Sequence, residues 1–299
     1  MSRDTILHMF TAAANLSPFD VNMAIDAGWQ HCIPYTGVGA RDVADLTQDA
    51  IFSRGPKGVK RTGIFVGGRD IHVAMDMLEQ ARKAMVPPFE VSVFADPSGA
   101  FTTAAGMVAC VEKHLAAQGG DVLSGKTALV FGGTGPVGMT CAMLAAQAGA
   151  RAVIISHQSD EKAEQAASAC NVRYGTDVTY GDGSNDDRVR RLLADADVVF
   201  SAAKAGIQVL GAEHLTSAVR VKVLCDVNAV PPAGIAGVGV MDDGVPVAAT
   251  PNGALGIGAL AVGNVKYKTQ QALLRQMVET DSPVYLHFEQ AFTTARENV

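Results

Sequence analysis

Short apolar runs alternate with longer amphipathic stretches through the first third of the chain. Four extended or apolar runs predict strands, at residues 5–10, 31–34, 63–66 and 90–94. Apolar positions at helical spacing predict helices over residues 19–27, 40–52, 71–85 and 102–117. This alternation is typical of a parallel sheet with helices on both faces, and the last of these helices leads into a second domain.

The second domain opens with a strand, a glycine-rich turn and a helix. Residues 127–131 are apolar and β-prone, and they run into Gly133-x-Gly135-x-x-Gly138, a helical pattern over 139–150 and a strand at 152–155. In a dinucleotide site the first glycine makes the tight turn, the second admits the pyrophosphate and the third lets the helix pack on the strand. A purely structural glycine turn is the alternative. We expect the dinucleotide site, formed by Gly133, Thr134, Gly135, Pro136, Val137 and Gly138.

The position that normally contacts the adenosine ribose carries no carboxylate. An NAD-specific site usually has Asp or Glu about 20 residues beyond the glycines. Here the stretch is Ser156-His157-Gln158-Ser159, and the first carboxylate is Asp160. Uncharged donors admit a 2′-phosphate, although an Arg that would favour NADP alone is missing. We therefore expect both NADP and NAD as cofactors, while Ser159 or Asp160 is also suited to cap the helix over 161–170.

Further strands place more residues at the same edge. A helix is predicted over 187–195, with strands over 198–203 and 221–227, and ligands bind beyond the carboxyl ends of such strands. Ala202, Ala203, Asp226 and Asn228 are therefore cofactor-site candidates. A glycine-rich turn over 252–258 leads into a last long helix near 260–279.

These patterns predict an α/β protein of two α/β domains, the second a Rossmann-type doubly wound parallel sheet. Residues 1–110 form the expected substrate domain, joined by the C-terminal helices of 270–299. Residues 111–269 form the expected NAD(P)-binding Rossmann domain. The active site is expected in the cleft between the domains.

Composition narrows the class of protein. The chain has 299 residues, 48% of them hydrophobic and 18% charged, which is typical of a globular protein. The net charge of −6 argues against nucleic acid or an anionic membrane surface as the main partner. No apolar run reaches membrane-spanning length, and residues 1–5 lead into a strand rather than a signal peptide. The scattered cysteines lack zinc-site spacing and predict reduced thiols, no metal and a cytoplasmic location; they are Cys32, Cys110, Cys141, Cys170 and Cys225.

The sequence offers no evident proton relay. None of the five tyrosines has Lys four residues later, so the Tyr-x-x-x-Lys pair of short-chain dehydrogenases is missing. A nicotinamide cofactor supplies hydride chemistry by itself. The pattern favours a reaction that needs no general acid, such as hydride removal from a carbon between two nitrogens.

Six ordered blocks, spanning about residues 17–270, carry a family resemblance. They are Ser17-Pro18-Phe19-Asp20-Val21, Ile64-Phe65-Val66-Gly67-Gly68-x-Asp70, Asp96-x-x-Gly99-x-x-Thr102-Thr103-Ala104-Ala105-Gly106, Gly133-Thr134-Gly135-Pro136-Val137-Gly138-Met139, Asp226-x-Asn228-Ala229-x-Pro231-Pro232 and Gly253-Ala254-Leu255-Gly256-Ile257-Gly258. Together they resemble the NAD(P)-dependent methylene-tetrahydromethanopterin dehydrogenases of methylotrophic bacteria.

The resemblance implies oxidation of the methylene bridge of a tetrahydropterin to a methenyl group, within one-carbon (formaldehyde) oxidation. Ser156-His157-Gln158 and residues 261–266 look closer to the family variant that uses both NAD and NADP. A homo-oligomer, trimer or hexamer, is also implied. Activity on methylene-tetrahydrofolate is an alternative.

In that reaction several residues are candidates for substrate contact or catalysis. Asp20 is suited to hold the aminopyrimidine N–H groups, or is an ordinary acid in a first helical turn. Lys266 is suited to meet a pterin oxygen, or lies on an exposed helix face. Thr102 and Thr103 at a helix start donate to a ligand or merely cap. Phe19 and Asn252 complete the expected substrate site.

Two rival functions remain open at this stage. One is another NAD(P) oxidoreductase, acting on a small hydroxy or amino acid, which should need an acid–base residue. The other is a non-catalytic regulator that binds NADPH and reports redox state. Such a regulator should bind NADP tightly and turn over nothing.

Overall fold

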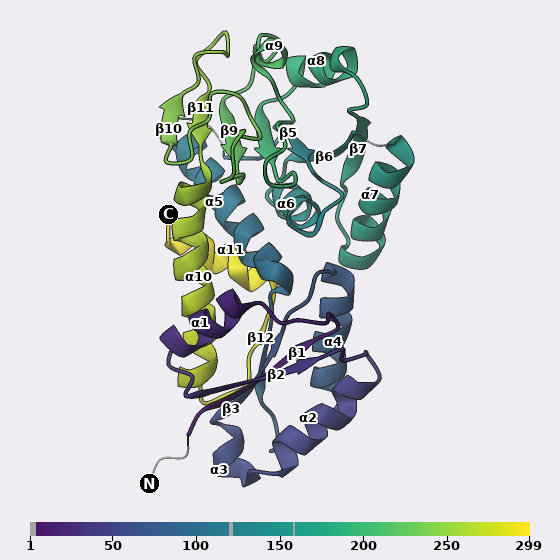
Figure 1. The fold of residues 1–299 in the computed structure, drawn as a ribbon, viewed down its shortest axis with the longest axis vertical. Coiled ribbons are helices and arrows are strands. Elements are labelled where there is room, and N and C mark those ends of the chain that lie inside the picture. The colour runs from purple at the N-terminus through teal and green to yellow at the C-terminus, as the bar shows by residue number, and fades with distance from the viewer. Residues whose placement is uncertain (1–3, 120–121, 158) are drawn as a thin grey trace. The chain divides into compact units, whose positions relative to one another are not determined.

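The computed structural model describes residues 4–119, 122–157 and 159–299, and it forms two compact α/β units (Figure 1). Unit 1 comprises Met1–Thr102 and Tyr267–Asn298, and unit 2 comprises Thr103–Lys266 with Val299. The limits expected from the sequence, near residues 110 and 270, lie a few residues later. The expected α/β class with a doubly wound parallel sheet is confirmed.

Unit 1 is built on a parallel sheet of five strands, in the order β12-β4-β3-β1-β2. Its elements are β1 (Ile6–Thr11), α1 (Pro18–Asp26), β2 (His31–Thr36), α2 (Asp42–Phe52), α3 (Gly55–Val59), β3 (Thr62–Val66), α4 (Ile71–Lys83), β4 (Ser92–Ala95), the short 3₁₀ helix η1 (Pro97–Gly99), β12 (Tyr285–Leu286) and α11 (Phe288–Glu297). Two long helices, α5 (Ala100–Ala117) and α10 (Ala259–Glu279), contribute residues to both units.

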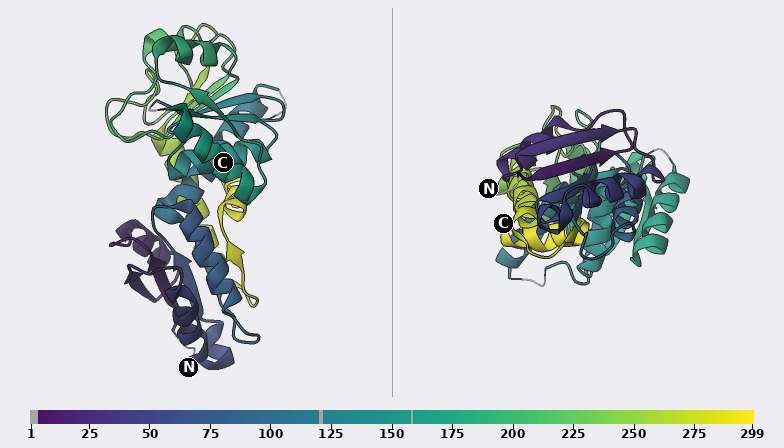
Figure 2. Two further views of the ribbon diagram at one scale, coloured as in Figure 1. Left: turned by 90° about the vertical axis from the view of Figure 1, so that its right-hand side faces the viewer. Right: turned by 90° about the horizontal axis from the view of Figure 1, so that it is seen from below.

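The last segment of the chain, yellow in Figures 1 and 2, completes the core of unit 1. Strand β12 pairs with β4, and Val93 N donates to Val284 O at 2.9 Å. The buried indole of Trp29 donates to Leu274 O of α10 at 3.1 Å. A Cβ at Gly63 of β3 would lie 2.6 Å from Trp29 Cη2, so the indole ring leaves room only for glycine at this position. The C-terminal segment Tyr267–Asn298 therefore belongs to unit 1.

Unit 2 holds seven strands in the order β10-β11-β9-β8-β5-β6-β7, all parallel except the edge strand β10. The chain starts at β5, moves outward to β7 and returns to β8, so the switch point lies between β5 and β8. Its other elements are β5 (Thr127–Phe131), α6 (Pro136–Gln147), β6 (Arg151–Ser156), α7 (Asp160–Tyr174), β7 (Thr179–Asp182), α8 (Asp186–Ala194), β8 (Val198–Ser201), α9 (Ala212–Leu215), β9 (Val223–Asp226), β10 (Asp243–Pro246) and β11 (Leu255–Ile257).

One face of this sheet packs on α8 and α9. Alternate strand residues such as Leu129, Val153 and Val199 share a buried cluster with Leu193 of α8 and Leu215 of α9. Because side chains alternate along a strand, the residues between them face the opposite side of the sheet. That side of the sheet packs on α6 and α7. A ligand can therefore approach β5 only at the ends of the strands.

The structure also bears on the surroundings of the molecule. No helix among the described residues combines the length and apolar character needed to cross a bilayer. All five cysteines are free thiols. Burial raises the pKa of the Cys32 thiol to about 11 and that of Cys110 to about 12, so both are protonated at neutral pH.

Strand β10 is tied to helix α5 by charge. His114 Nε2 lies 2.6 Å from Asp243 Oδ1, and Lys113 Nζ lies 3.0 Å from Asp243 Oδ2. The hydrogen bond from His114, followed by the contacts with Lys113, lowers the pKa of Asp243 against the opposing effect of burial. The side chain of Asp243 is about half-exposed, at 47%, so solvent weakens these contacts.

We expect Asp243→Asn to make the free energy of unfolding depend less on pH in the acid range. Because the folded pKa is lowered, the stabilisation is present above about pH 4 and is lost as the pH falls through the folded value. The expected loss at pH 7 is at most about 1 kcal/mol, with almost none at pH 2. Urea unfolding across this range measures it, with Asp281→Asn in the exposed pair with Lys60 as control. Equal losses for Asp243→Asn at pH 7 and pH 2 would contradict the assignment.

Candidate active site

The turn between β5 and α6 brings backbone against backbone. A Cβ at Gly133 would lie 2.7 Å from Val130 O and 2.8 Å from Ile154 Cγ2, and one at Gly138 would overlap the Gly132 carbonyl. Gly135 is the N-cap of α6 and has no side-chain cap, and Pro136 follows at the first helical position. The first-turn N–H groups have no intrahelical acceptor, so they are suited to an anion. The six expected residues, Gly133 to Gly138, thus form one cradle.

The tight turn that the spacing assigns to Gly133 is made by Gly132. Gly132 has φ +70°, and a Cβ there would lie 2.6 Å from the backbone of both Ala202 and Ala203. Gly133 instead lies where β5 and β6 leave no space for a side chain. Gly138 was expected to let the helix pack on the strand; here it lets the start of α6 lie against the backbone of Gly132 and Gly133. The contact with Ala202 also places the turn after β8 directly beside the cradle, as the sequence predicts.

Residues 156–159, the segment expected to lie near the adenosine ribose, connect β6 to α7. Ser156 is buried, and its Oγ accepts from Ser159 N at 3.4 Å. Ser159 caps α7 by accepting from Lys162 N, which confirms one of the two roles considered for it. His157 is exposed, and Gln158 lies outside the described residues. The described part of this segment carries no carboxylate until Asp160.

Asp226 and Asn228 shape the loop after β9. Asp226 is buried and accepts from Asn228 N and Ile235 N, each at 3.1 Å. Burial raises the pKa of Asp226, while these hydrogen bonds lower it. Asn228 Oδ1 accepts from Gly206 N, and its Nδ2 donates to Pro232 O at 2.8 Å. Asp226 therefore holds its own loop, and Asn228 also joins this loop to the chain after β8. Their contact with a cofactor stays a prediction.

Asn252 lies at the amino ends of the strands of the same sheet, opposite the ends that carry the glycine turn. It precedes β11, which runs parallel to β9, and its Nδ2 donates to Val221 O at 2.8 Å, before β9 begins. The glycine turn follows the carboxyl end of β5. The structure thus does not bring Asn252 to the cradle, and its amide has a structural partner, so its expected role in substrate binding loses its support.

In unit 1, Asp20 is held at the start of α1. Ser17 caps this helix by accepting from Phe19 N at 3.3 Å. Asp20 is only 3% exposed, and its Oδ1 accepts from Gln270 Nε2 of α10 at 3.0 Å. The neighbouring Phe19 ring is 46% exposed. A carboxylate and an aromatic side chain are the kinds of group that bind a planar heterocycle with N–H donors, and both occur in the first turn of α1.

Thr102 and Thr103 have different surroundings. Thr102 Oγ1 donates to Asp96 Oδ2 at 2.7 Å and lies 3.3 Å from Gly99 O, and Asp96 Oδ1 accepts from the backbone N–H of Phe101 and Thr102. Asp96 is fully buried, directly follows β4 and holds the first turn of α5 through these bonds. An acid directly after a buried strand is the pattern by which the sequence could have indicated it. Thr103 is half-buried and has no side-chain hydrogen bond among the described residues.

Lys266 is half-buried in α10 and belongs to unit 2, whereas Asp20 belongs to unit 1. Their joint action in one catalytic centre stays a prediction. Across the part of the chain that the structure describes, no group of three or more His, Cys, Asp or Glu side chains could hold a metal ion.

Residues 18–98 match the model of the N-terminal domain of methylene-tetrahydromethanopterin dehydrogenase. The chain is also 49% identical over 294 residues to the NAD(P)-dependent methylenetetrahydromethanopterin dehydrogenase of Methylorubrum extorquens AM1, covering 98% of each chain. The chain belongs to this family.

A second sequence match and a solved structure are also similar to this chain. The bifunctional protein MdtA of the same organism is 34% identical over 98% of each chain. The solved shikimate 5-dehydrogenase of Listeria monocytogenes, in complex with shikimate and NAD, superposes with a TM-score of 0.52. At 15% identity, covering 92% of this chain and 91% of that one, this likeness shows the fold alone.

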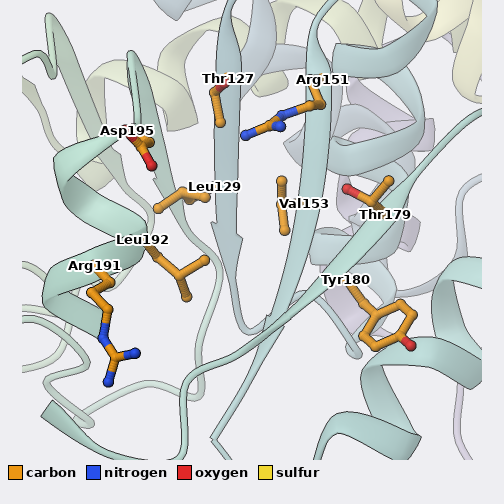
Figure 3. A pocket seen from close by; sticks show the side chains of 9 residues that line it. All are labelled: Thr127, Leu129, Arg151, Val153, Thr179, Tyr180, Arg191, Leu192 and Asp195. Carbon is orange, nitrogen blue, oxygen red and sulfur yellow. The ribbon is translucent and has the colours of Figure 1, made fainter. Parts of the chain in front are cut away.

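One hollow of unit 2 lies away from the cradle. It has a volume of about 440 Å³ and is lined by Thr127 and Arg151, which begin β5 and β6, with Tyr180 and residues of α8 (Figure 3). The cradle of this family member lies at the other ends of those strands. The hollow is therefore no part of the candidate dinucleotide site.

We expect Gly135→Ala to weaken dinucleotide binding without loss of stability. Its backbone (φ −87°, ψ 167°) suits any residue, and a Cβ would lie 3.4 Å from its nearest neighbour, Gly132 O. The methyl group would occupy only the space of the pyrophosphate, and binding should weaken by about tenfold or more. Calorimetric titration with NADP and thermal unfolding measure the two effects.

Gly132→Ala is the matched control at the same turn. Its φ of +70° and its contact with Ala202 leave no room for a side chain, so the melting temperature should fall. Unchanged NADP affinity in a folded Gly135→Ala protein would show that the cradle does not hold the pyrophosphate.

Proposed function

We propose that this protein oxidises the methylene group of methylene-tetrahydromethanopterin to a methenyl group, with direct transfer of a hydride to NAD(P), in one-carbon oxidation. The proposal rests on the 49% identity over 98% of both chains to the Methylorubrum enzyme of that name. The glycine cradle at the switch point of unit 2 supports it, because it offers the site that such a cofactor needs.

The cofactor would be held by the cradle and by the strand ends beside it. Once bound, its nicotinamide ring accepts the hydride. The N–H groups at the start of α6 would hold the pyrophosphate, and the uncharged Ser156, His157 and Gln158 would admit either NAD or NADP. Ala202, Ala203 and the loop that Asp226 and Asn228 shape would border the rest of the dinucleotide.

The protein needs no general acid for this chemistry. Removal of a hydride from a carbon between two nitrogens leaves a cation that both nitrogens share. The main task of the site is to hold that carbon ~3–3.5 Å from the nicotinamide in an aligned pose. A fixed carboxylate near the pterin also favours the developing positive charge.

Asp20 is our candidate for that carboxylate. Its burial and its hydrogen bond from Gln270 fix its position, and Phe19, the residue before it, is 46% exposed. Thr103, with its hydroxyl outside the Asp96 network, and Lys266 would complete the contacts to the substrate. Thr102 acts through that network, by holding the start of α5.

We further infer a cytoplasmic location from the five free cysteines, since unpaired thiols are typical of a reducing compartment. A homo-oligomer and the absence of a nucleic-acid partner stay predictions.

A spectrophotometric assay tests the function. The protein should convert methylene-tetrahydromethanopterin and NAD or NADP into the methenyl product and the reduced cofactor, seen as two rising absorbance bands. Methylene-tetrahydrofolate is run in parallel as the alternative substrate. Turnover of the folate alone would correct the substrate, and no change with either pterin would reject the proposal.

We expect Asp20→Asn to lower kcat/KM about tenfold or more with the fold intact. The amide keeps the acceptor for Gln270 but removes the charge that favours the pterin cation. Steady-state kinetics and the melting temperature measure the two effects.

Ser17→Ala is the control on the same helix. It removes the N-cap, so it should cost about 1 kcal/mol of stability and leave the kinetics unchanged. Wild-type kinetics in Asp20→Asn would reduce Asp20 to an ordinary first-turn acid.

A further inference from the structure

An arginine from α8 reaches the carboxyl end of β7. Asn185 caps α8 by accepting from Arg188 N at 3.1 Å, and the Arg188 guanidinium forms an ion pair with Asp182, the last residue of β7. Asp182 Oδ1 also accepts from Ser184 N at 2.8 Å, so the turn fixes this carboxylate. The Arg188 side chain is about half-exposed, at 48%.

This ion pair lies beside residues 156–159, the segment expected to lie near the adenosine ribose. Strands β6 and β7 are parallel neighbours, and Asp182 is the register partner of Ser156. The turn after Asp182 is bound to the same place, because Gly183 N donates to Ser156 O at 3.0 Å. The cation is therefore next to the segment where the sequence shows no carboxylate and no arginine.

The two partners come from opposite faces of the sheet. A Cβ at Gly181 would lie 3.3 Å from Leu192 of α8, so Gly181 faces that helix. Asp182, the next residue, belongs to the other face, which it shares with Ser156. Arg188 starts from α8, so its side chain passes over the end of β7 to reach Asp182. Its guanidinium thus lies at the open carboxyl edge and not within the core.

We propose that Arg188 binds the 2′-phosphate of NADP and that its pairing with Asp182 permits NAD to bind as well. The proposal rests on the proposed function only in taking the glycine cradle as the dinucleotide site. A guanidinium has five N–H donors in a planar fork, enough to serve a carboxylate and a phosphate together. When the ribose carries no phosphate, Asp182 neutralises the cation, so NAD meets no unpaired charge.

Other arginines of α8 provide a matched control. Arg190 Nη1 lies 3.5 Å from Asp187 Oδ1, and Arg191 Nε donates to Asp187 O. Arg191 lines the hollow near the beginnings of the strands in Figure 3. Both contact the first turn of their own helix, so removing either changes the net charge equally without touching Asp182.

Equilibrium titration with NADP, NAD and adenosine 2′-phosphate tests the proposal, without any need for turnover. Arg188→Ala should weaken NADP and adenosine 2′-phosphate by about tenfold or more and NAD by less than about twofold. Arg190→Ala should leave the ratio of the two cofactor affinities unchanged. Asp182→Asn keeps the cation and removes a negative charge that would repel the 2′-phosphate, so it should tighten NADP. It also tests the proposal if Arg188→Ala does not fold.

An unchanged ratio of NADP to NAD affinity in both Arg188→Ala and Asp182→Asn would overturn the proposal, as would an equal effect of Arg190→Ala. Failure of this proposal can be distinguished from failure of the proposed function. A protein that binds both cofactors but oxidises no pterin would refute the activity and leave Arg188 in place, whereas wild-type NADP affinity in an active Arg188→Ala enzyme would do the reverse.

Discussion

Direct contact of backbone with backbone at the turn after β5 is the constraint on which unit 2 depends. Gly132, Gly133 and Gly138 let the turn, the start of α6 and the chain after β8 meet with no side chain between them. The same contact leaves α6 without a side-chain cap at Gly135. The first-turn N–H groups, which other helices often satisfy with a side-chain cap, are left for a ligand, so the packing of the fold and the binding of an anion are one arrangement.

In each unit, a carboxylate at a strand end shapes the loop that follows. Asp96 after β4 and Asp226 at the end of β9 both accept backbone N–H groups from the residues that follow them. Each loop is thereby rigid before any ligand arrives, which reduces the ordering that binding requires. Each of these two strand-end acids thus acts first on its own loop, whereas Asp20, in the first turn of α1, is held by a side chain from α10.

Strands with continuous apolar sequence were predictable, and those defined by pairing were not. The five residues of β5 were predicted at their observed limits because an apolar run and a glycine bound them. Strand β7 is Thr-Tyr-Gly-Asp at a sheet edge, and β12 has only two residues, so neither carries a periodic signal. The site shows the same division. The glycine cradle is local in sequence. By contrast, Asn252 lies at the amino ends of the strands, away from the cradle, and Arg188 reaches their carboxyl ends. Both placements follow from strand order and direction.

The return of the chain to its first unit has a consequence for biosynthesis. Unit 2 is nearly continuous in sequence, whereas unit 1 needs Leu274 to accept from Trp29 and β12 to pair with β4. On a ribosome the nucleotide-binding half can therefore mature while the earlier half still waits for its closing strand. Vectorial synthesis would thus reverse the usual order, with the segment translated first being the last to become native.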